Sequence, residues 1–216
     1  MITFYGYFRS SAAYRCRIAL NLKDISYKFV PVHLRRNGGE QKQPNYLAIN
    51  PQGLVPALDV DGTILTQSLA IIEYLDDAYP TPRLLSGDAL KRAQARAFAE
   101  IIACDIHPLQ NLRVLQYLKQ ELQQTQNEAD KWCQNWIHKG LSSCEALISA
   151  QDQKYDFAFG NAPGLADICL IPQLYAAQRF GVELSSMQNL LRIRKNCNEI
   201  AAFQNAHPDN QPDYEA

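Results

Sequence analysis

A short polar elbow, Arg9-Ser10-Ser11, lies between an apolar run and a helical pattern. The apolar run, residues 2–7, is typical of a buried strand, and residues 11–22 have apolar positions at helical spacing. A serine that opens a helix can cap it, because its hydroxyl accepts a hydrogen bond from an otherwise unpaired N–H group. The same position can bind an anion, because free amides and the positive end of the helix dipole point outward there. The elbow is therefore a helix cap alone or an anion site.

A second elbow of this kind occurs at Gln67-Ser68, before the apolar helical pattern that Pro80 ends. A serine hydroxyl and a glutamine amide at a helix N-terminus suit a carboxylate, although a plain cap is the alternative here too. If both elbows follow the C-terminal ends of strands in one sheet, they belong to one site.

Composition excludes several classes of function. The chain has 216 residues and a net charge of −1, which gives no reason to expect nucleic acid or an anionic membrane as a partner. No apolar run approaches the roughly 18 residues of a membrane span, and the start lacks the basic region of a signal peptide. The six cysteines occur singly and the four histidines lie far apart. This pattern predicts no metal site and reduced, packed thiols in a cytoplasmic protein.

The elements expected to position the elbows alternate in type over the first eighty residues. Residues 2–7 and 27–32 are predicted strands with a helix between them, so they should be parallel. The pair Asp61-Gly62, between residues 56–60 and 63–65, predicts a β-hairpin. The order strand, helix, strand, then hairpin and helix is that of a thioredoxin-like α/β domain.

The rest of the chain shows helical periodicity without strand signals, which predicts an all-α domain with a tryptophan- and leucine-rich core. The polar ending from His207 is predicted to be an extended tail. Within residues 11–22 and just beyond, the pattern assigns Arg15, Arg17 and Lys23 to the wetter positions. The expected domains are residues 1–80, a linker at 81–88 that contains Pro82 and Gly87, and residues 89–216.

Five stretches resemble the zeta class of the glutathione transferases over essentially the full length of the chain. The stretches are FRSSAAYRCRIAL, NPQGLVPAL, TQSLAIIEYLD, CDIHPLQNLRVLQYL and GLADICLIPQ. The resemblance implies the glutathione transferase fold, with a thioredoxin-like N-terminal domain that binds glutathione and an all-α C-terminal domain that binds substrate. It also implies a homodimer. It further implies isomerisation of a small dicarboxylic keto-acid, maleylacetoacetate, to fumarylacetoacetate by reversible addition of the glutathione thiolate.

The resemblance also assigns residues to roles. The implied catalytic residues are Ser10, Ser11 and Arg15. The implied glutathione contacts are Gln41, Val55, Pro56, Gln67, Ser68, His107 and Asn111. The implied substrate-binding residues are Arg9, Arg113 and Arg179, and no metal is implied.

Physical reasons support several of these roles. A free thiol has a pKa of about 8.5, so little of it is thiolate at neutral pH. A hydroxyl that donates to the sulfur stabilises the thiolate and lowers this pKa. The sequence leaves open whether Ser10 or Ser11 does so. Guanidinium groups bind carboxylates in bidentate geometry, although a solvated surface charge is the alternative for each arginine. The resemblance favours a cis peptide bond before Pro56, where a plain strand start is the alternative.

Some positions carry other expectations. Position 12 is alanine where the zeta pattern usually has cysteine, so no protein thiol can act there. His107 can hydrogen-bond glutathione, cap a helix or fill space before Pro108. Asp167 is expected to stabilise the fold through a capping box, not to catalyse.

Three other functions fit the same motifs. The first is isomerisation of maleylpyruvate, and the second is glutathione transfer to α-haloacids. The third is a non-catalytic glutathione-binding module, against which the joint presence of Ser10, Val55-Pro56 and Gln67-Ser68 argues, because a scaffold needs none of them.

Overall fold

The computed structural model describes residues 1–215, and the chain divides into two compact units. The first unit contains Met1–Leu84 together with the segment from Ile200 onward, and the second contains Leu85–Glu199. The expected domain boundary near residues 81–88 lies close to this division. The units differ from the expected domains at the C-terminal end, because the segment from Ile200 onward groups with the first unit.

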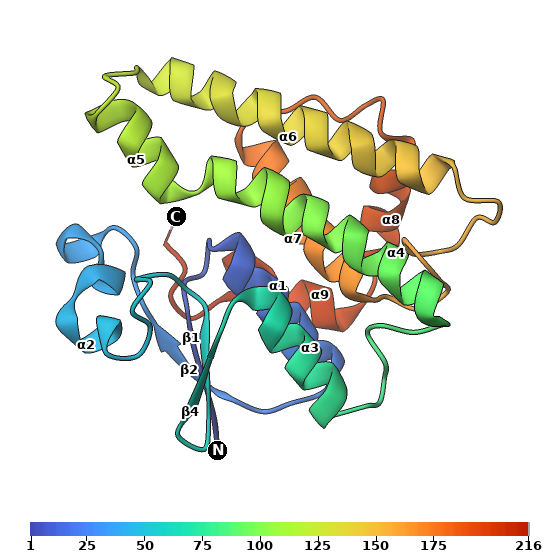
Figure 1. Ribbon diagram of the computed structural model, residues 1–216, viewed down its shortest axis with the longest axis horizontal. Coiled ribbons are helices and arrows are strands. Elements are labelled where there is room, and N and C mark those ends of the chain that lie inside the picture. The colour runs from blue at the N-terminus through green and yellow to red at the C-terminus, as the bar shows by residue number, and fades with distance from the viewer. Residues whose placement is uncertain (216) are drawn as a thin grey trace. The chain divides into compact units, whose positions relative to one another are not determined.

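A four-stranded mixed sheet forms the centre of the first unit, in the order β2-β1-β3-β4. β1 pairs in parallel with β2 and antiparallel with β3, which pairs antiparallel with β4 (Figure 1). The strands are β1 (Ile2–Gly6), β2 (Lys28–Pro31), β3 (Ala57–Val60) and β4 (Thr63–Thr66). Each strand begins and ends within one residue of its predicted position. The hairpin turn is the predicted Asp61-Gly62, whose φ angles of 49° and 90° match the left-handed backbone that such turns require.

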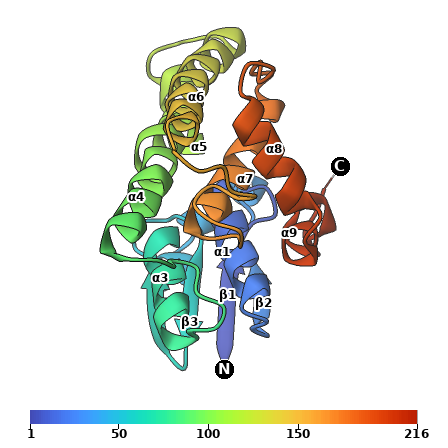
Figure 2. The same cartoon turned by 90° about the vertical axis from the view of Figure 1, so that its right-hand side faces the viewer.

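Helices cover both faces of this sheet. α1 (Ser11–Leu22) and α3 (Ser68–Ala78) lie side by side on one face (Figure 2). The segment with the short helix α2 (Pro44–Leu47) lies on the opposite side. Two 3₁₀ turns precede it, η1 (Arg36–Gly38) and η2 (Glu40–Lys42).

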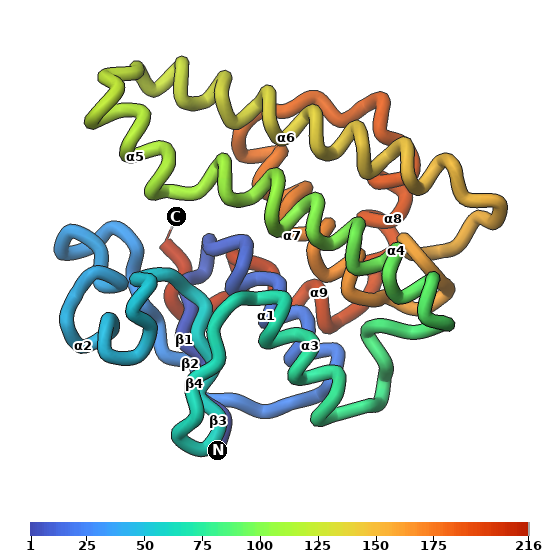
Figure 3. The backbone as a smooth tube through the Cα atoms, viewed as in Figure 1, coloured from blue at the N-terminus to red at the C-terminus, as the bar shows by residue number. Residues whose placement is uncertain are grey.

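The C-terminal segment belongs to the first unit because it packs on α1. α9 (Ala201–Ala206) lies beside α1 and contacts it (Figure 3). Asn21 Nδ2 donates to the carbonyl of Ala202 at 3.0 Å. A 3₁₀ turn, η5 (Pro208–Asn210), follows α9. The tail expected to be extended is thus held by specific hydrogen bonds, among them one from Phe8 N–H to Asp213 Oδ2 at 2.9 Å.

Three basic side chains of the α1 region are buried, so the prediction that they take wetter positions was wrong. Arg15 and Arg17 are 1% and 0% exposed, and Lys23 is 7% exposed. Arg17 donates to the carbonyls of Ala206, Tyr7 and Phe8 at 3.1, 3.4 and 2.9 Å. Burial of these cations is possible because α3 and α9 enclose α1 and supply acceptors for their N–H groups.

The second unit is helical throughout its regular elements. Its longest helix, α6, buries Cys133, Ile137 and Leu141, which lie at helical spacing, whereas Leu147 near its C-terminal end is 47% exposed. The helices are α4 (Ala89–Glu100), the π-helix η3 (Ile101–Ile106), the 3₁₀ turn η4 (His107–Gln110), α5 (Leu112–Gln120), α6 (Gln126–Ser149), α7 (Leu165–Arg179) and α8 (Gln188–Asn198). In residues 1–215, no helix is long and apolar enough to cross a membrane.

Candidate active site

The first elbow places Ser10 at the N-cap of α1. Its Oγ accepts from Ala13 N–H at 3.2 Å, and its own N–H donates to the Tyr7 carbonyl at 3.0 Å. A hydroxyl that accepts from a backbone amide still has its hydrogen to donate. Ser11 is the first helical residue and is buried. Ser10 therefore caps the helix and still has a hydroxyl hydrogen that can be donated to an anion, so the helix cap and the anion site are compatible with each other.

The second elbow is linked to α1 through a buried guanidinium. Arg15 Nη1 donates to Ser68 Oγ at 3.2 Å, and Ser68 opens α3. Arg15 Nε and Nη2 are buried and have no acceptor among residues 1–215. Buried donors without acceptors are costly, and a carboxylate is the acceptor that a guanidinium binds best. The buried charge of Arg15 therefore lies directly behind the Ser68 hydroxyl, where it favours a carboxylate at the start of α3.

Gln67, just before Ser68, has an unusual backbone conformation, with a φ of 69°. Non-glycine residues rarely adopt positive φ, and such residues concentrate at functional sites. Its side chain is exposed, and Nε2 donates to Gln52 Oε1 at 2.9 Å. In the second elbow, Gln67 is thus the exposed residue and Ser68 the buried one.

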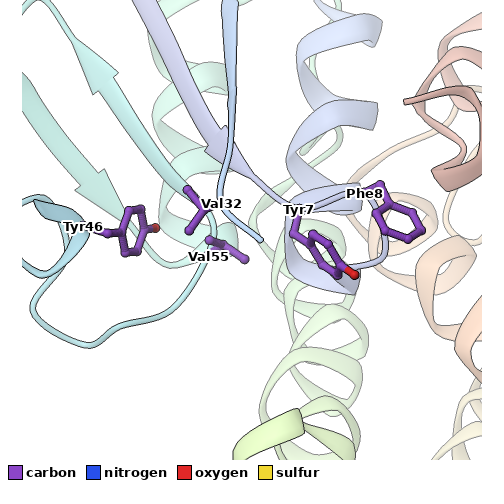
Figure 4. Packing of buried hydrophobic residues seen from close by; sticks show 5 residues of the cluster. All are labelled: Tyr7, Phe8, Val32, Tyr46 and Val55. Carbon is purple, nitrogen blue, oxygen red and sulfur yellow. The ribbon is translucent and has the colours of Figure 1, made fainter. Parts of the chain in front are cut away.

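The peptide bond between Val55 and Pro56 is cis, as the family resemblance implied. Val55 lies in a buried cluster with Tyr7, Phe8, Val32 and Tyr46, and Figure 4 shows Val32 and Val55 between Tyr46 on one side and the two N-terminal aromatic residues on the other. The ladder of β3 begins only at Ala57, so it does not use the main-chain groups of Val55.

The loop before Val55 is held by two hydrogen bonds to one carbonyl. Tyr46 Oη and Asn50 Nδ2 both donate to the Leu54 carbonyl at 2.7 Å. Burial raises the pKa of Tyr46, so this phenol remains a donor. These bonds fix the backbone that leads into Val55-Pro56.

Gln41 lies in η2 and is buried. Its Nε2 donates to the Leu34 carbonyl at 3.5 Å, while its Oε1 is buried without a donor among the described residues. The structure shows no contact between Gln41 and either elbow. It shows a free acceptor, which is compatible with the expected role in binding glutathione.

In the second unit, the expected glutathione contacts His107 and Asn111 lie at the two ends of η4. Asn111 caps α5, because its Oδ1 accepts from Arg113 N–H at 3.1 Å. Trp132 Nε1 donates to the Leu109 carbonyl at 2.8 Å and so anchors the turn to α6. These hydrogen bonds fix the backbone that carries His107 and Asn111.

The interior of this turn contains a pair of glutamines. Gln110 Nε2 donates to Gln173 Oε1 at 2.9 Å, and Gln173 Nε2 donates back to Gln110 Oε1 at 3.3 Å. Both amides are buried, and the reciprocal bonds satisfy them. The sequence gives no local signal for this pairing, because the two residues are 63 positions apart.

The three arginines proposed to bind substrate occur at element ends. Arg9 is the first residue of the first elbow, and its Cζ lies 5.6 Å from the centre of the Phe8 ring. Arg113 is the second residue of α5 and Arg179 is the last residue of α7, and both are exposed. Arg9 is half-buried.

The cysteines do not form a reactive centre. Five of the six are buried, and burial raises the pKa of Cys133 and of Cys144 to about 12 and also raises that of Cys197. Such thiols are inert at neutral pH. In residues 1–215, no three His, Cys, Asp or Glu side chains are grouped to hold a metal ion.

Asp167 has the structural role expected from the sequence. Its Oδ1 accepts from Ala158 N–H and its Oδ2 from Gly164 N–H, both at 2.9 Å, at the start of α7. The residue is 1% exposed, and burial raises its pKa to about 6 despite these hydrogen bonds, which favour the ionised form.

Asp167→Asn is expected to change how stability depends on pH. The folded-state pKa of Asp167 exceeds its unfolded value, so ionisation costs stability as pH rises from about 4 to about 6. Over that range, the free energy of unfolding of the unmodified protein should decline relative to that of the variant by up to about 3 kcal/mol. Urea unfolding of both proteins across this range measures the difference. A difference that does not vary with pH would contradict the raised pKa.

The family model described as glutathione S-transferase, N-terminal domain, matches residues 4–83. A maleylacetoacetate isomerase of Pseudomonas aeruginosa is 50% identical over 97% of both chains. A solved maleylpyruvate isomerase, described as a bacterial glutathione S-transferase of the zeta class, aligns with a TM-score of 0.96 at 41% identity. It covers 99% of this chain, and this chain covers 100% of it.

A maleylacetoacetate isomerase from Methylobacterium extorquens AM1, solved with malonate and glutathione bound, aligns with a TM-score of 0.94 at 39% identity. The alignment covers 99% of this chain and 100% of that structure. The mixed sheet and the helical unit therefore have the glutathione transferase fold, which confirms the predicted fold class. The chain belongs to the zeta class of the glutathione transferase family.

Proposed function

We propose that this protein is a glutathione-dependent cis–trans isomerase that converts maleylacetoacetate into fumarylacetoacetate. The observation that supports this most directly is Ser10, whose hydroxyl caps α1 and keeps a hydrogen to donate. It occurs in a chain 50% identical, over nearly its whole length, to a maleylacetoacetate isomerase.

The residues of the two elbows fit glutathione. Ser68 would hold a carboxylate at the start of α3, with the charge of Arg15 behind its hydroxyl at 3.2 Å. Val55 would bind through main-chain groups that the sheet does not use. The other proposed contacts are Gln41, Pro56, Gln67, His107 and Asn111. When bound, glutathione supplies a thiolate that can add reversibly to an activated double bond.

Ser10 would stabilise that thiolate. Its hydroxyl would donate to the sulfur, and the N-terminus of α1 would add the partial positive charge of its free amides. Ser11 is the alternative donor, although it lies inside the first turn of the helix. Arg15 would contribute through its hydrogen bond to Ser68. With alanine at position 12, no protein thiol competes with glutathione at this elbow.

Arg9, Arg113 and Arg179 would bind the carboxylates of the keto-acid. Arg179→Ala is expected to raise KM for the keto-acid about tenfold, because a charge-assisted contact is lost. Arg113→Ala should do the same, while KM for glutathione changes little in both variants. Steady-state kinetics with each substrate varied in turn measure these constants.

Lys131→Ala is a matched control, because it removes one exposed positive charge from α6 in the same unit. Its KM for the keto-acid should match that of the unmodified protein. Equal effects in Lys131→Ala and Arg179→Ala would show that only net charge matters and would contradict a specific contact.

Maleylpyruvate is the second candidate substrate. A maleylpyruvate isomerase aligns with this chain at a TM-score of 0.96, which favours it over α-haloacids or a module that only binds glutathione. The deciding experiment measures turnover of maleylacetoacetate and maleylpyruvate with and without glutathione. Glutathione-dependent isomerisation supports the proposal, and the ratio of the two kcat/KM values identifies the preferred substrate. Glutathione binding without isomerisation of either would refute it.

Two further properties belong to this proposal. A homodimer follows from the family resemblance and can be measured by light scattering after gel filtration. A cytoplasmic location is supported by six cysteines without a disulfide, which are typical of reducing compartments.

A further inference from the structure

The C-terminal segment of the first unit reaches the loop that carries the catalytic serine. Asp213 Oδ2 accepts from Phe8 N–H at 2.9 Å, although the two residues are 205 positions apart. We propose that Asp213 is a positioning residue that holds the Tyr7–Ser10 loop so that Ser10 faces the glutathione sulfur. This inference rests on the proposed function, in which Ser10 stabilises the thiolate.

Both peptide groups of Phe8 are held by buried or half-buried charged side chains. Its N–H donates to Asp213, and its carbonyl accepts from Arg17 Nη2 at 2.9 Å. Arg17 Nη1 also donates to the Tyr7 carbonyl, which accepts from Ser10 N–H. Because Phe8 lies two residues before Ser10, rotation of either peptide group would turn the Ser10 hydroxyl. Asp213 and Arg17 therefore fix the backbone from which the Ser10 side chain extends, and Ala13 N–H holds the Oγ itself.

Residues 211–215, the part of the C-terminal segment that contains Asp213, are held at both ends. At its start, Gln211 Nε2 donates to the carbonyls of Asn205 and His207 at 2.8 and 2.9 Å. At its end, Glu215 accepts a hydrogen bond from His33 Nε2 at 3.1 Å and forms an ion pair with Arg36. These contacts hold Asp213 in place from both sides along the chain.

The contacts of Glu215 and Tyr214 show how residues 211–215 are held against the first unit. His33 Nδ1 accepts from the backbone N–H groups of Arg35 and Arg36, so its hydrogen is on Nε2 and can donate to Glu215. The Tyr214 ring packs edge-to-face on the Phe8 ring with a centroid distance of 5.5 Å. Asp213 and Tyr214 thus both contact Phe8 in the Tyr7–Ser10 loop, which is called the serine loop below.

An acceptor, not a charge, is what Phe8 N–H requires. Asp213→Asn keeps an oxygen at this position, whereas Asp213→Ala removes it. Asp209→Ala is the matched control, because Asp209 is an exposed carboxylate four residues earlier in the same segment that makes no contact with the serine loop.

The test measures the pKa of the thiol of bound glutathione, from the ultraviolet absorbance of the thiolate, and kcat/KM as a function of pH. In Asp213→Ala, that pKa should rise by about one unit and kcat/KM near neutral pH should fall about tenfold. The loss should disappear at high pH, and KM for the keto-acid should change less than about twofold, since the arginines are intact. Asp213→Asn should stay within about threefold of the unmodified protein, and Asp209→Ala should match it.

An unchanged thiol pKa in a folded Asp213→Ala variant would overturn the proposal, even if stability falls. If that variant does not fold, Asp213→Glu gives the same test, because it keeps the charge and displaces the acceptor by one methylene. A raised thiol pKa in Asp213→Glu supports the proposal and an unchanged one overturns it. If the unmodified protein isomerises neither substrate, the proposed function fails, while the thiol titration still decides the role of Asp213.

Discussion

Ser10→Ala is expected to lower kcat/KM for glutathione-dependent isomerisation on the order of 100-fold at neutral pH. The variant loses the hydroxyl that would donate to the glutathione sulfur, so the thiol pKa rises and the thiolate fraction falls. The Oγ of Ser10 also accepts from Ala13 N–H, so the variant should lose about 1 kcal/mol of stability as well. Steady-state kinetics and a thiolate titration separate the two effects.

Two companion variants identify the donor. Ser10→Thr keeps both the hydroxyl and the cap and should retain most of the activity. Ser11→Ala tests the adjacent serine, and a larger loss there than in Ser10→Ala would assign the donor role to Ser11. Wild-type rates in both alanine variants would show that neither hydroxyl stabilises the thiolate.

Lys23→Met should be the most destabilising of these substitutions, with a loss of about 3–5 kcal/mol in the free energy of unfolding. Lys23 Nζ donates to Asp76 Oδ1 at 2.7 Å, to the Tyr79 carbonyl at 2.6 Å and to the Pro82 carbonyl. The side chains of Lys23 and Asp76 are 0% and 6% exposed. Methionine has a similar length, so the variant removes the ammonium group from two carbonyls and from a buried carboxylate, which still accepts from Leu84 N–H at 2.7 Å.

Urea unfolding followed by circular dichroism measures this loss. Lys28→Met is the matched control, because it makes the same chemical change at an exposed position of β2. It should alter stability by less than about 0.5 kcal/mol. A similar small effect for Lys23→Met would mean that the buried cation contributes little beyond what an apolar chain provides.

Local structure followed closely from the sequence. Residues 11–22 were predicted to be helical and form α1, because Ser10 caps the start and the apolar spacing persists to Leu22. The Asp61-Gly62 turn was predictable because few residues other than glycine, asparagine and aspartate accept its positive φ angles. The two serine elbows were found for the same reason, since a helix start has a short sequence signature.

Contacts between distant segments required the tertiary structure. Asn198 ends α8 and Ala201 begins α9, so two helices form here although Ile193, Ile200 and Phe203 lie at the spacing of a single helix. Ile200 between them is extended, with a φ of −96° and a ψ of 124°. Apolar spacing alone does not reveal such a break, because both helices keep apolar residues in phase with the pattern.

The sequence by itself determined the zeta-class motifs, the two elbows and the strand order along the chain. Only the tertiary structure decided that Arg17 and Lys23 are buried and that Asp213 holds Phe8. A helical pattern assigns charged residues to the solvent side, since an unpaired buried charge is costly. That rule failed at Arg17 because its acceptors include the Ala206 carbonyl, 189 positions away. Acceptors this distant in sequence become neighbours only when the C-terminal segment packs on α1.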